Sequence, residues 1–274
     1  MFFVEPIAGA VVGKIWDERR LIAAYAKDFY QMITKGQLKL LVFGAAGTGK
    51  TTFGKILDGQ EDIGQISGTY SLSSETEFYG IEDKHFVTIS VPPGQSAFRP
   101  RHWAQLYKVL QNSKRSIVVN VVSWGFHSVE RQDLNGIDEF KNGVSEETKA
   151  MFLHNRRQTE MRTLGEIVQP LSNYQPHLHM ITLVTKQDLW WKDRSSTRGF
   201  YERPDGVYLN TLQGIYEAKG KANFTHHFRS VSFGQINFKT ADGHILFETA
   251  AGYDNGILGA NFDNFMNLLR QIAQ

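Results

Sequence analysis

The sequence predicts a three-layer α/β domain with a mostly parallel sheet. Two near-continuous apolar runs, at 116–122 and 179–184, are typical of strands that are buried on both faces of a parallel sheet. Segments with helical periodicity alternate with these and other short apolar runs, which is the pattern of strand–helix–strand units. A further apolar run, at 38–43, enters a glycine-rich loop, so a ligand is expected where this strand ends.

The expected elements follow from hydrophobic periodicity and from turn residues. Ser145, followed by Glu146 and Glu147, marks the start of a long helix, because serine caps a first turn and acidic residues favour its positive end. In chain order we expect an amphipathic helix over 16–34, a strand over 38–43, a helix ending near 57, strands over 69–79 and 85–91, a helix over 98–110, a strand over 116–122, a helix from 145 to about 168, a strand over 179–184, a helix over 206–218, a strand over 225–231 and a helix around 262–272.

The pattern divides the chain into an N-terminal extension over 1–37, which carries the amphipathic helix, and one domain over 38–274. Irregular insertions are expected near 124–143 and near 234–255. Their composition is polar and glycine-containing, without a sustained helical or strand period. Neither insertion has an assigned function, and both are expected to be docking surfaces for other proteins.

Composition excludes several classes of function. Of the 274 residues 41% are hydrophobic, enough for a sizeable core, and the net charge of +2 is too small to indicate a nucleic-acid partner. The chain has no cysteine, which excludes disulfides, thiolate metal sites and cysteine nucleophiles. This composition fits a reducing compartment, so we expect a cytoplasmic protein.

The apolar N-terminal stretch at 2–12 is not expected to span a membrane. Glu5 and Pro6 interrupt it, Lys14 and Asp17 follow it closely, and it is shorter than a bilayer requires. We expect a docking segment or a buried lead-in, with membrane contact at most peripheral.

The loop from Gly44 to Thr51 carries the G-x-x-x-x-G-K-[ST] pattern of a phosphate-binding loop. Its glycines let backbone N–H groups turn toward an anion, and a helix beginning near Gly49 adds its positive end. Lys50 supplies an ammonium group for the β- and γ-phosphates, and Thr51 supplies a hydroxyl for Mg²⁺. The pattern predicts binding of a nucleoside triphosphate; the alternative is a chance glycine-rich turn. The residues assigned to the nucleotide here are Gly44, Ala46, Gly47, Thr48, Gly49, Lys50, Thr51 and Thr52.

A second motif, Thr185-Lys186-Gln187-Asp188, follows the apolar run at 179–184. Together with the phosphate loop it resembles the GTP-binding domain of the Ras-like and translation-factor class. The resemblance implies that Asp188 accepts hydrogen bonds from guanine N1 and N2, that Lys186 covers the base, and that Thr185 stands where Asn is commoner. Adenine has no matching pair of donors, so this aspartate favours guanine. Alone, such a tetrapeptide is also compatible with a surface turn.

The same resemblance implies a third base-contacting loop, which we place at Ser232 and Phe233, with Ser230 as an alternative. It also implies a threonine that closes over Mg²⁺ and the γ-phosphate. Thr69, 69 − 51 = 18 residues past Thr51, has the matching spacing, and Thr76 is its rival.

Catalytic residues are also implied by the resemblance. Gly94 matches the glycine that contacts the γ-phosphate, Gln95 matches the residue that orients the attacking water, and Lys50 completes the set. Arg99 and Arg101 could supply charge at the transition state or form an ordinary basic turn, and we assign them no catalytic role.

Val91 departs from the family pattern, because the family has an aspartate there that holds Mg²⁺ through a water molecule. Valine cannot replace this contact, so we expect weaker Mg²⁺ binding and slow hydrolysis. Pro92 and Pro93 also restrict the chain that follows.

The resemblance therefore implies a GTP/GDP-binding switch that uses Mg²⁺, hydrolyses GTP slowly and changes its contacts with regulatory or effector proteins. Homo-oligomerisation stays open, and no nucleic-acid partner is expected. Two alternatives remain: a GTP-binding interaction module that lacks hydrolysis, and an ATP-using phosphate-loop protein in which the motif at 185–188 is accidental.

Overall fold

The structure is a computed structural model that describes residues 38–57, 77–79, 89–91, 115–127, 129, 132–174 and 177–273. The N-terminal extension expected over 1–37, with its helix, and the helix expected over 98–110 lie outside these residues. The two strands expected over 69–79 and 85–91 are described only at their ends, as Glu77–Tyr79 and Ile89–Val91.

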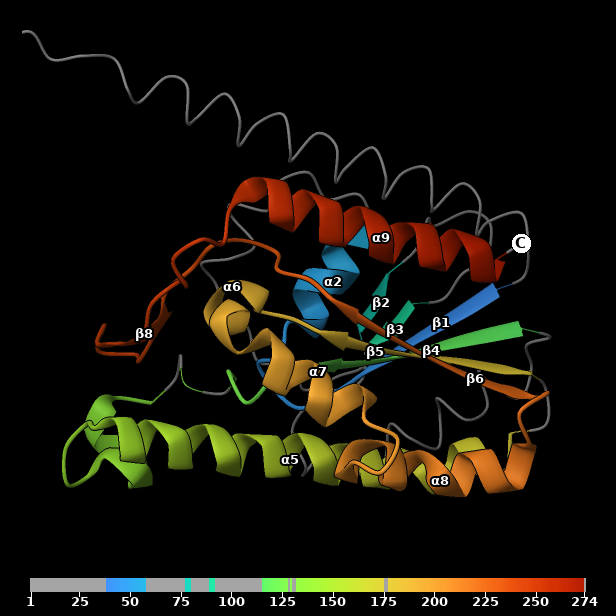
Figure 1. Ribbon diagram of the computed structural model, residues 1–274, viewed down its shortest axis with the longest axis horizontal. Helices are drawn as coiled ribbons and strands as arrows, with labels where there is room; N and C mark the ends of the chain where they lie inside the picture. Colours follow the sequence, from blue (N-terminus) through green and yellow to red (C-terminus); the bar gives the residue numbers. More distant parts are fainter. Residues whose placement is uncertain are drawn as a thin grey trace, which may run out of the picture.

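A six-stranded sheet in the order β2-β3-β1-β4-β5-β6 forms the centre of the domain (Figure 1). The strands β3, β1, β4, β5 and β6 are parallel, and β2 is antiparallel to β3. The prediction of an α/β domain with a mostly parallel sheet is confirmed. The strands are β1 (Leu38–Phe43), β2 (Glu77–Tyr79), β3 (Ile89–Val91), β4 (Arg115–Val122), β5 (Leu178–Val184) and β6 (Phe224–Ser230).

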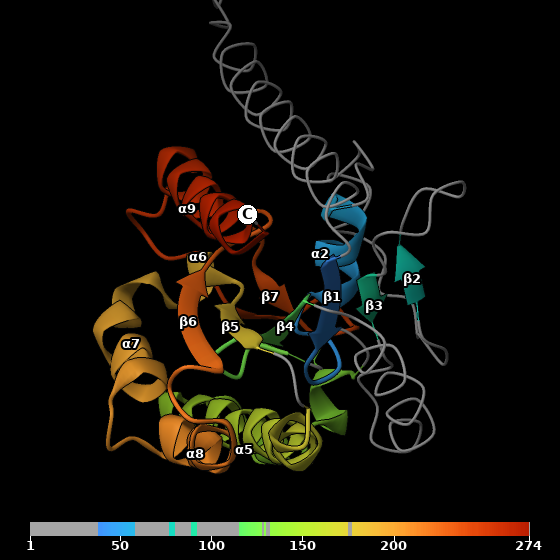
Figure 2. The same ribbon diagram turned by 90° about the vertical axis from the view of Figure 1, so that its right-hand side faces the viewer.

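Helices cover both faces of this sheet, so that the domain has three layers. α2 and α9 lie on one face, and α5 and α8 lie on the other (Figures 1 and 2). Within the part of the chain that the structure describes, no helix has the length and apolar character needed to cross a membrane. The helices are α2 (Lys50–Leu57), α5 (Glu146–Ser172), α6 (Gln187–Trp190), α7 (Arg194–Glu202), α8 (Val207–Lys219) and α9 (Asn255–Ala273), with 3₁₀ turns η1 (Leu134–Gly136), η2 (Asp138–Phe140) and η3 (Trp191–Asp193).

The central strands are apolar along their whole length because both of their faces are covered. Val118, Val119 and Ile181 are fully buried, and Val119 pairs with Ile181 between β4 and β5. A separate hydrophobic core lies on each face, one built with α5, α7 and α8 and the other with α2 and α9. Burial of apolar side chains such as these stabilises the domain.

The long helix α5 begins where its sequence predicts. The Ser145 hydroxyl accepts a hydrogen bond from the Thr148 backbone N–H at 3.2 Å, and the Thr148 hydroxyl accepts one from the Ser145 N–H at 2.8 Å. This reciprocal capping box satisfies two N–H groups at the helix start. The helix continues to Ser172 instead of about 168, with Pro170 in its last turn.

The insertion expected near 124–143 is irregular, yet it is part of the core. Phe126, Ile137 and Phe140 from this segment are buried, and the Phe140 ring stacks on Phe152 of α5 at a centroid distance of 5.4 Å. The burial of these apolar residues could not be predicted from the sequence, because they are few in a polar segment and follow neither a helical nor a strand period.

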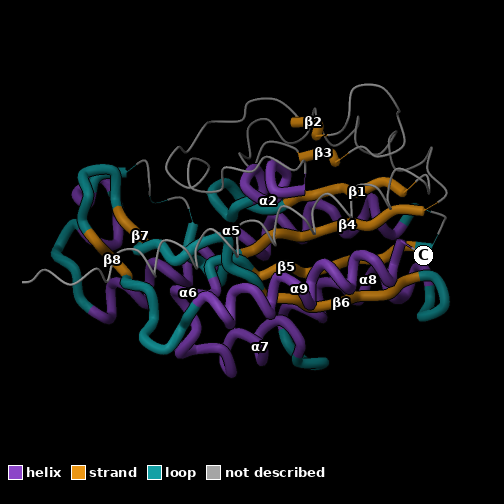
Figure 3. The backbone as a smooth tube through the Cα atoms, turned by 90° about the horizontal axis from the view of Figure 1, so that it is seen from above, coloured by secondary structure: helices purple, strands orange, loops and turns teal. Residues whose placement is uncertain are grey.

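Two features of the fold lie outside the sequence expectations. The helices α6 and α7, between 187 and 202, were not predicted, because α6 is only four residues long and the polar residues of α7 outnumber its two buried ones. The segment 234–255 contains a small antiparallel hairpin of β7 (Phe238–Lys239) and β8 (Ile245–Phe247), which lies beyond the carboxyl ends of the parallel strands (Figure 3).

A buried carboxylate ties α5 to the end of β4. Glu160 accepts hydrogen bonds from the backbone N–H groups of Ser123 at 2.8 Å and Gly125 at 3.2 Å, and from the Tyr201 hydroxyl at 3.0 Å. Burial raises the pKa of Glu160, while these donors act in the opposite direction. Glu160 therefore holds the loop after β4 by direct bonds to its backbone.

A buried histidine beside Glu160 makes the stability of the fold depend on pH. His127 Nε2 lies 3.1 Å from the Arg156 carbonyl oxygen and 3.6 Å from Glu160 Oε1, and burial lowers the pKa of His127 from 6.5 to about 3. Between these values the unfolded chain binds a proton that the native state does not bind. The contribution of His127 therefore falls as the pH falls through this window.

We predict that replacing His127 by glutamine reduces the loss of stability on acidification. At 1.36 kcal/mol per pKa unit, wild type should lose about 2 kcal/mol more unfolding free energy than the variant between pH 7 and pH 5. Urea unfolding at both pH values measures the difference. His154→Gln, at an exposed position, is the matched control. Equal losses in wild type and His127→Gln would contradict the prediction.

Candidate functional site

The loop that follows β1 passes so close to β4 that only glycine fits at its start. Gly44 has a φ of +149°, and a Cβ atom built there would lie 2.1 Å from the Val121 carbonyl oxygen. A side chain at this position would require the backbone of β4 to move. The glycine thus sets the path of the loop relative to the neighbouring strand.

The lysine of the loop folds back over it. α2 begins at Lys50, whose Nζ donates a hydrogen bond to the Ala45 carbonyl oxygen at 2.8 Å, and the Thr48 hydroxyl donates to the same oxygen at 3.0 Å. Lys50 is only 7% exposed, so its ammonium group lies within the loop. A buried cation beside the N-terminus of α2 concentrates positive potential at one point, which suits an anion such as a phosphate.

Thr185 connects this loop to the two central strands. Its hydroxyl lies 2.7 Å from the Thr48 carbonyl oxygen and 3.1 Å from the Val122 carbonyl oxygen, and its backbone N–H donates to Val122 at 2.8 Å. The resemblance groups Thr185 with the nucleotide-contacting residues. In the structure, however, the Thr185 hydroxyl donates to the loop backbone, so Thr185 positions the loop.

Lys186 has a strained backbone between β5 and α6. Its φ of 54° and ψ of 38° lie in the left-handed region, which is unfavourable for a residue with a side chain. Its Nζ lies 4.8 Å from the ring centroid of Phe238, which belongs to the hairpin of segment 234–255. The cation expected to cover a base therefore lies over an aromatic ring of the chain itself.

Asp188 is 2% exposed, and both of its carboxylate oxygens accept hydrogen bonds. Oδ1 accepts from the Ser232 hydroxyl at 2.6 Å, while Oδ2 accepts from the Ile236 backbone N–H at 3.1 Å and from the Thr249 hydroxyl at 3.4 Å. Burial raises the pKa of Asp188, and the bonds from Ser232 and Ile236 oppose this shift. Two of the three donors come from segment 234–255.

The base-loop candidates Ser232 and Phe233 approach both motifs. Ser232 binds Asp188, as described above, and the Phe233 ring lies 3.5 Å from the position that a Cβ atom would take at Gly49. The alternative, Ser230, instead accepts a hydrogen bond from Gln187 Nε2 at 2.8 Å and makes no described contact with Asp188. Among the described residues, the geometry thus favours Ser232 over Ser230.

The structure brings together most of the predicted nucleotide-site residues that it describes. Gly47, Thr48 and Gly49 lie in the loop, and Thr51 and Thr52 are half-buried in the first turn of α2. In the parts of the chain that the structure describes, no group of three or more histidine, aspartate or glutamate side chains could hold a metal ion, and Thr51 is the described candidate for Mg²⁺. Thr69, Thr76, Gly94 and Gln95 lie outside the described residues.

The residues near the motifs that were missed from the sequence include Ile236, Phe238 and Thr249. Each comes from segment 234–255, and each touches Lys186 or Asp188. A backbone N–H donor such as that of Ile236 carries no sequence signal, so only the tertiary structure identifies it.

Comparison with known proteins finds neither a matching family model nor a matching curated sequence. Similar solved structures include an ADP-ribosylation-factor-like GTP-binding protein (small COPII coat GTPase) from Encephalitozoon cuniculi in complex with GDP, at 12% identity and a TM-score of 0.45, covering 96% of this chain and 92% of that one. The mammalian signal recognition particle receptor (12% identity, TM-score 0.40, 85% and 99% covered) and the GDP form of the receptor SRb from Chaetomium thermophilum (9%, 0.40, 85% and 96%) are also similar. At these values the likeness carries no functional argument.

We predict that Thr185→Val destabilises the domain, because it leaves the Thr48 carbonyl oxygen without a buried donor. The expected loss of unfolding free energy is about 1–3 kcal/mol by urea denaturation. Thr185→Ser, which keeps the hydroxyl, should recover most of it. Thr211→Val is the control, since its hydroxyl bonds Val207 within α8 on the surface, and it should change stability by less than about 0.5 kcal/mol. Equal effects at both positions would refute the positioning role.

Proposed function

We propose that the chain binds GTP and GDP with Mg²⁺ and acts as a slow GTP-hydrolysing switch. The observation that carries the proposal is the physical connection between the phosphate loop and the base motif. Thr185 binds the loop at Thr48, and Phe233, next to the Asp188 partner Ser232, lies against Gly49. The motif after β5 meets the phosphate loop through Thr185, and the segment after β6 that bonds Asp188 meets it through Phe233, which an unrelated surface turn would not explain.

On the phosphate side, Lys50 and the loop backbone would hold the β- and γ-phosphates. Lys50 is already held in the loop by its bond to Ala45, so little side-chain entropy would be lost on binding. The Thr51 hydroxyl, in the first turn of α2, would be a ligand of Mg²⁺. When bound, Mg²⁺ neutralises part of the phosphate charge.

On the base side, Asp188 would accept two N–H groups of guanine. An ionised carboxylate has about four acceptor positions, and in the described structure the chain supplies three donors to them. Thr249 makes the longest of these bonds, at 3.4 Å, so we propose that guanine replaces it and moves segment 234–255 at that point. Regulatory or effector proteins would bind differently to the two positions of this segment. The proposed location of the protein is the cytoplasm.

The proposed function predicts a preference for guanine over adenine. Unlabelled GTP should displace labelled GTP from the purified protein at least about 100-fold better than ATP does, because adenine would leave the buried carboxylate short of donors. Asp188→Asn should weaken GTP binding by about 10- to 100-fold, with Asp133→Asn, an exposed aspartate, as the control. Equal competition by ATP would establish the ATP-using alternative instead.

A second candidate function is a GTP-binding interaction module without turnover, and the position of Val91 favours it. Val91 is the last residue of β3, which is parallel to β1 and adjacent to it in the sheet. The strand therefore ends beside the phosphate loop with valine where the resembling family has an aspartate. A valine cannot hold a water molecule on Mg²⁺.

The position of Val91 predicts the effect of restoring an aspartate there. Val91→Asp should lower the Mg²⁺ concentration needed for half-maximal hydrolysis by about tenfold or more. It should also raise the single-turnover rate of GTP hydrolysis, because an outer-shell carboxylate orients the metal-bound water. Val91→Asn, which has a similar size and no charge, should have a smaller effect. A rate and an Mg²⁺ dependence that stay unchanged in Val91→Asp would remove Val91 as the cause of slow hydrolysis.

A further inference from the structure

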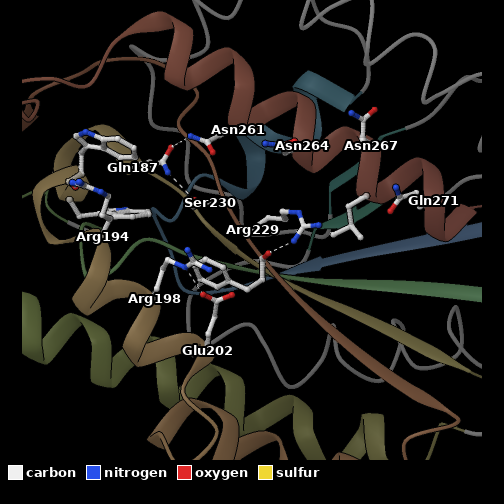
Figure 4. A pocket seen from close by; sticks show the side chains of 14 residues that line it. Gln187, Arg194, Arg198, Glu202, Arg229, Ser230, Asn261, Asn264, Asn267 and Gln271 are labelled. Atoms are coloured by element: carbon white, nitrogen blue, oxygen red, sulfur yellow. Dashed lines mark hydrogen bonds and ion pairs between the residues drawn. The ribbon is translucent and has the colours of Figure 1, made fainter.

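A cavity of about 570 Å³ lies on the outer side of β6 (Figure 4). Phe228, Arg229 and Ser230 of β6 line it on one side, α7 lines a second side and α9 a third. We call this cavity the β6 groove. It lies away from the phosphate loop, which follows the central strand β1. Its size is that of a typical ligand site.

The α7 side of the groove carries charge. Arg194, Arg198 and Glu202 are spaced by four residues and therefore share one face of the helix. Arg198 is paired with Glu202 at 2.7 Å, whereas the Arg194 guanidinium lies over the Trp191 ring at 4.8 Å and donates to the Trp191 carbonyl oxygen. With Arg229 the described lining has three guanidinium groups and one carboxylate, a net charge of 3 − 1 = +2.

The α9 side of the groove carries carboxamides. Asn261, Asn264, Asn267 and Gln271 line it, and Figure 4 shows them along one side of that helix. Ten residues of α-helix span about 15 Å, which equals the length of four to five residues of extended chain. A carboxamide both donates and accepts hydrogen bonds, so this row matches the alternating N–H and C=O groups of a peptide backbone, with Asn261 limited to accepting because its amide already donates to Gln187 and Ile257.

The strand between these two walls is the edge of the sheet. β6 pairs with β5 on one side, and the described residues place no strand on its other side. In a parallel ladder, alternate peptide groups of an edge strand point outward and can pair with an added chain. Arg229 Nη1 donates to the Phe228 carbonyl oxygen at 2.7 Å, so this guanidinium occupies an acceptor of the edge and has to leave it when an added chain pairs there.

We propose that the β6 groove binds an extended acidic segment of a partner protein, which adds to β6 as a further strand. The edge strand would pair with the backbone of the segment, and the carboxamides of α9 would bond its opposite edge. Arg194 and Arg229 would bind its carboxylates, since Arg198 is held by Glu202. The net positive lining disfavours basic segments and therefore favours an acidic partner. The groove is separate from the phosphate loop, and it shares Gln187 with the motif at 185–188.

The test uses the full chain and a fluorescein-labelled six-residue peptide of alternating aspartate and valine, followed by fluorescence anisotropy. The peptide should bind with a dissociation constant in the micromolar range, and its affinity should fall as the salt concentration rises. The double variant Arg194→Gln/Arg229→Gln should bind at least about tenfold more weakly, and Arg203→Gln, an exposed arginine outside the groove, should bind as wild type does. Asn264→Asp adds a carboxylate to the groove without removing a cation and should weaken binding about tenfold.

Three outcomes would overturn the proposal. The first is absence of binding, or equal binding by all of these variants. The second is equal binding of a peptide with N-methylated backbone nitrogens, because strand addition requires the N–H groups. The third is equal competition by inorganic tripolyphosphate, which would identify a plain anion site. Loss of binding on N-methylation, on exchange of aspartate for asparagine, and in Asn264→Asp would support it.

Discussion

The parallel pairing of β1, β4, β5 and β6 is the constraint on which the site depends. Because these strands run in one direction, their carboxyl ends meet at one edge of the sheet, where backbone groups that leave the ladder need new partners. The chain continues the pairing beyond the strands: Thr185 N–H donates to Val122 and Val231 N–H donates to Val184. The loop, the base motif and the segment after β6 are therefore placed side by side.

Three buried charged side chains at this edge have hydrogen-bonding partners. Lys50 binds Ala45, Asp188 binds Ser232 and Ile236, and Glu160 binds the loop after β4. A buried carboxylate or ammonium is tolerated only with such partners, because the cost of removing it from water is large. These bonds hold the loops of the site, and some of them would be exchanged for bonds to a ligand on binding.

The sequence predicted much of the fold and the two motifs, but little of what surrounds them. Strong apolar runs identify β4 and β5, and the spacing of glycines with Lys50 identifies the loop. The helix α7 was missed because its buried residues, Thr197 and Tyr201, do not form an apolar stripe. The donors around Asp188 were missed because one is a backbone N–H, at Ile236, more than forty positions along the chain.

By itself the sequence determined the sheet, the phosphate-loop pattern and the aspartate at 188, because these depend on local composition and on short spacing. Only the tertiary structure decided what the motif residues touch. It turned the Thr185 hydroxyl toward the loop, placed Lys186 over Phe238, and closed segment 234–255 over Asp188. It also placed an arginine-lined groove at β6. Such contacts join residues far apart in the chain, and packing, which no local pattern encodes, selects them.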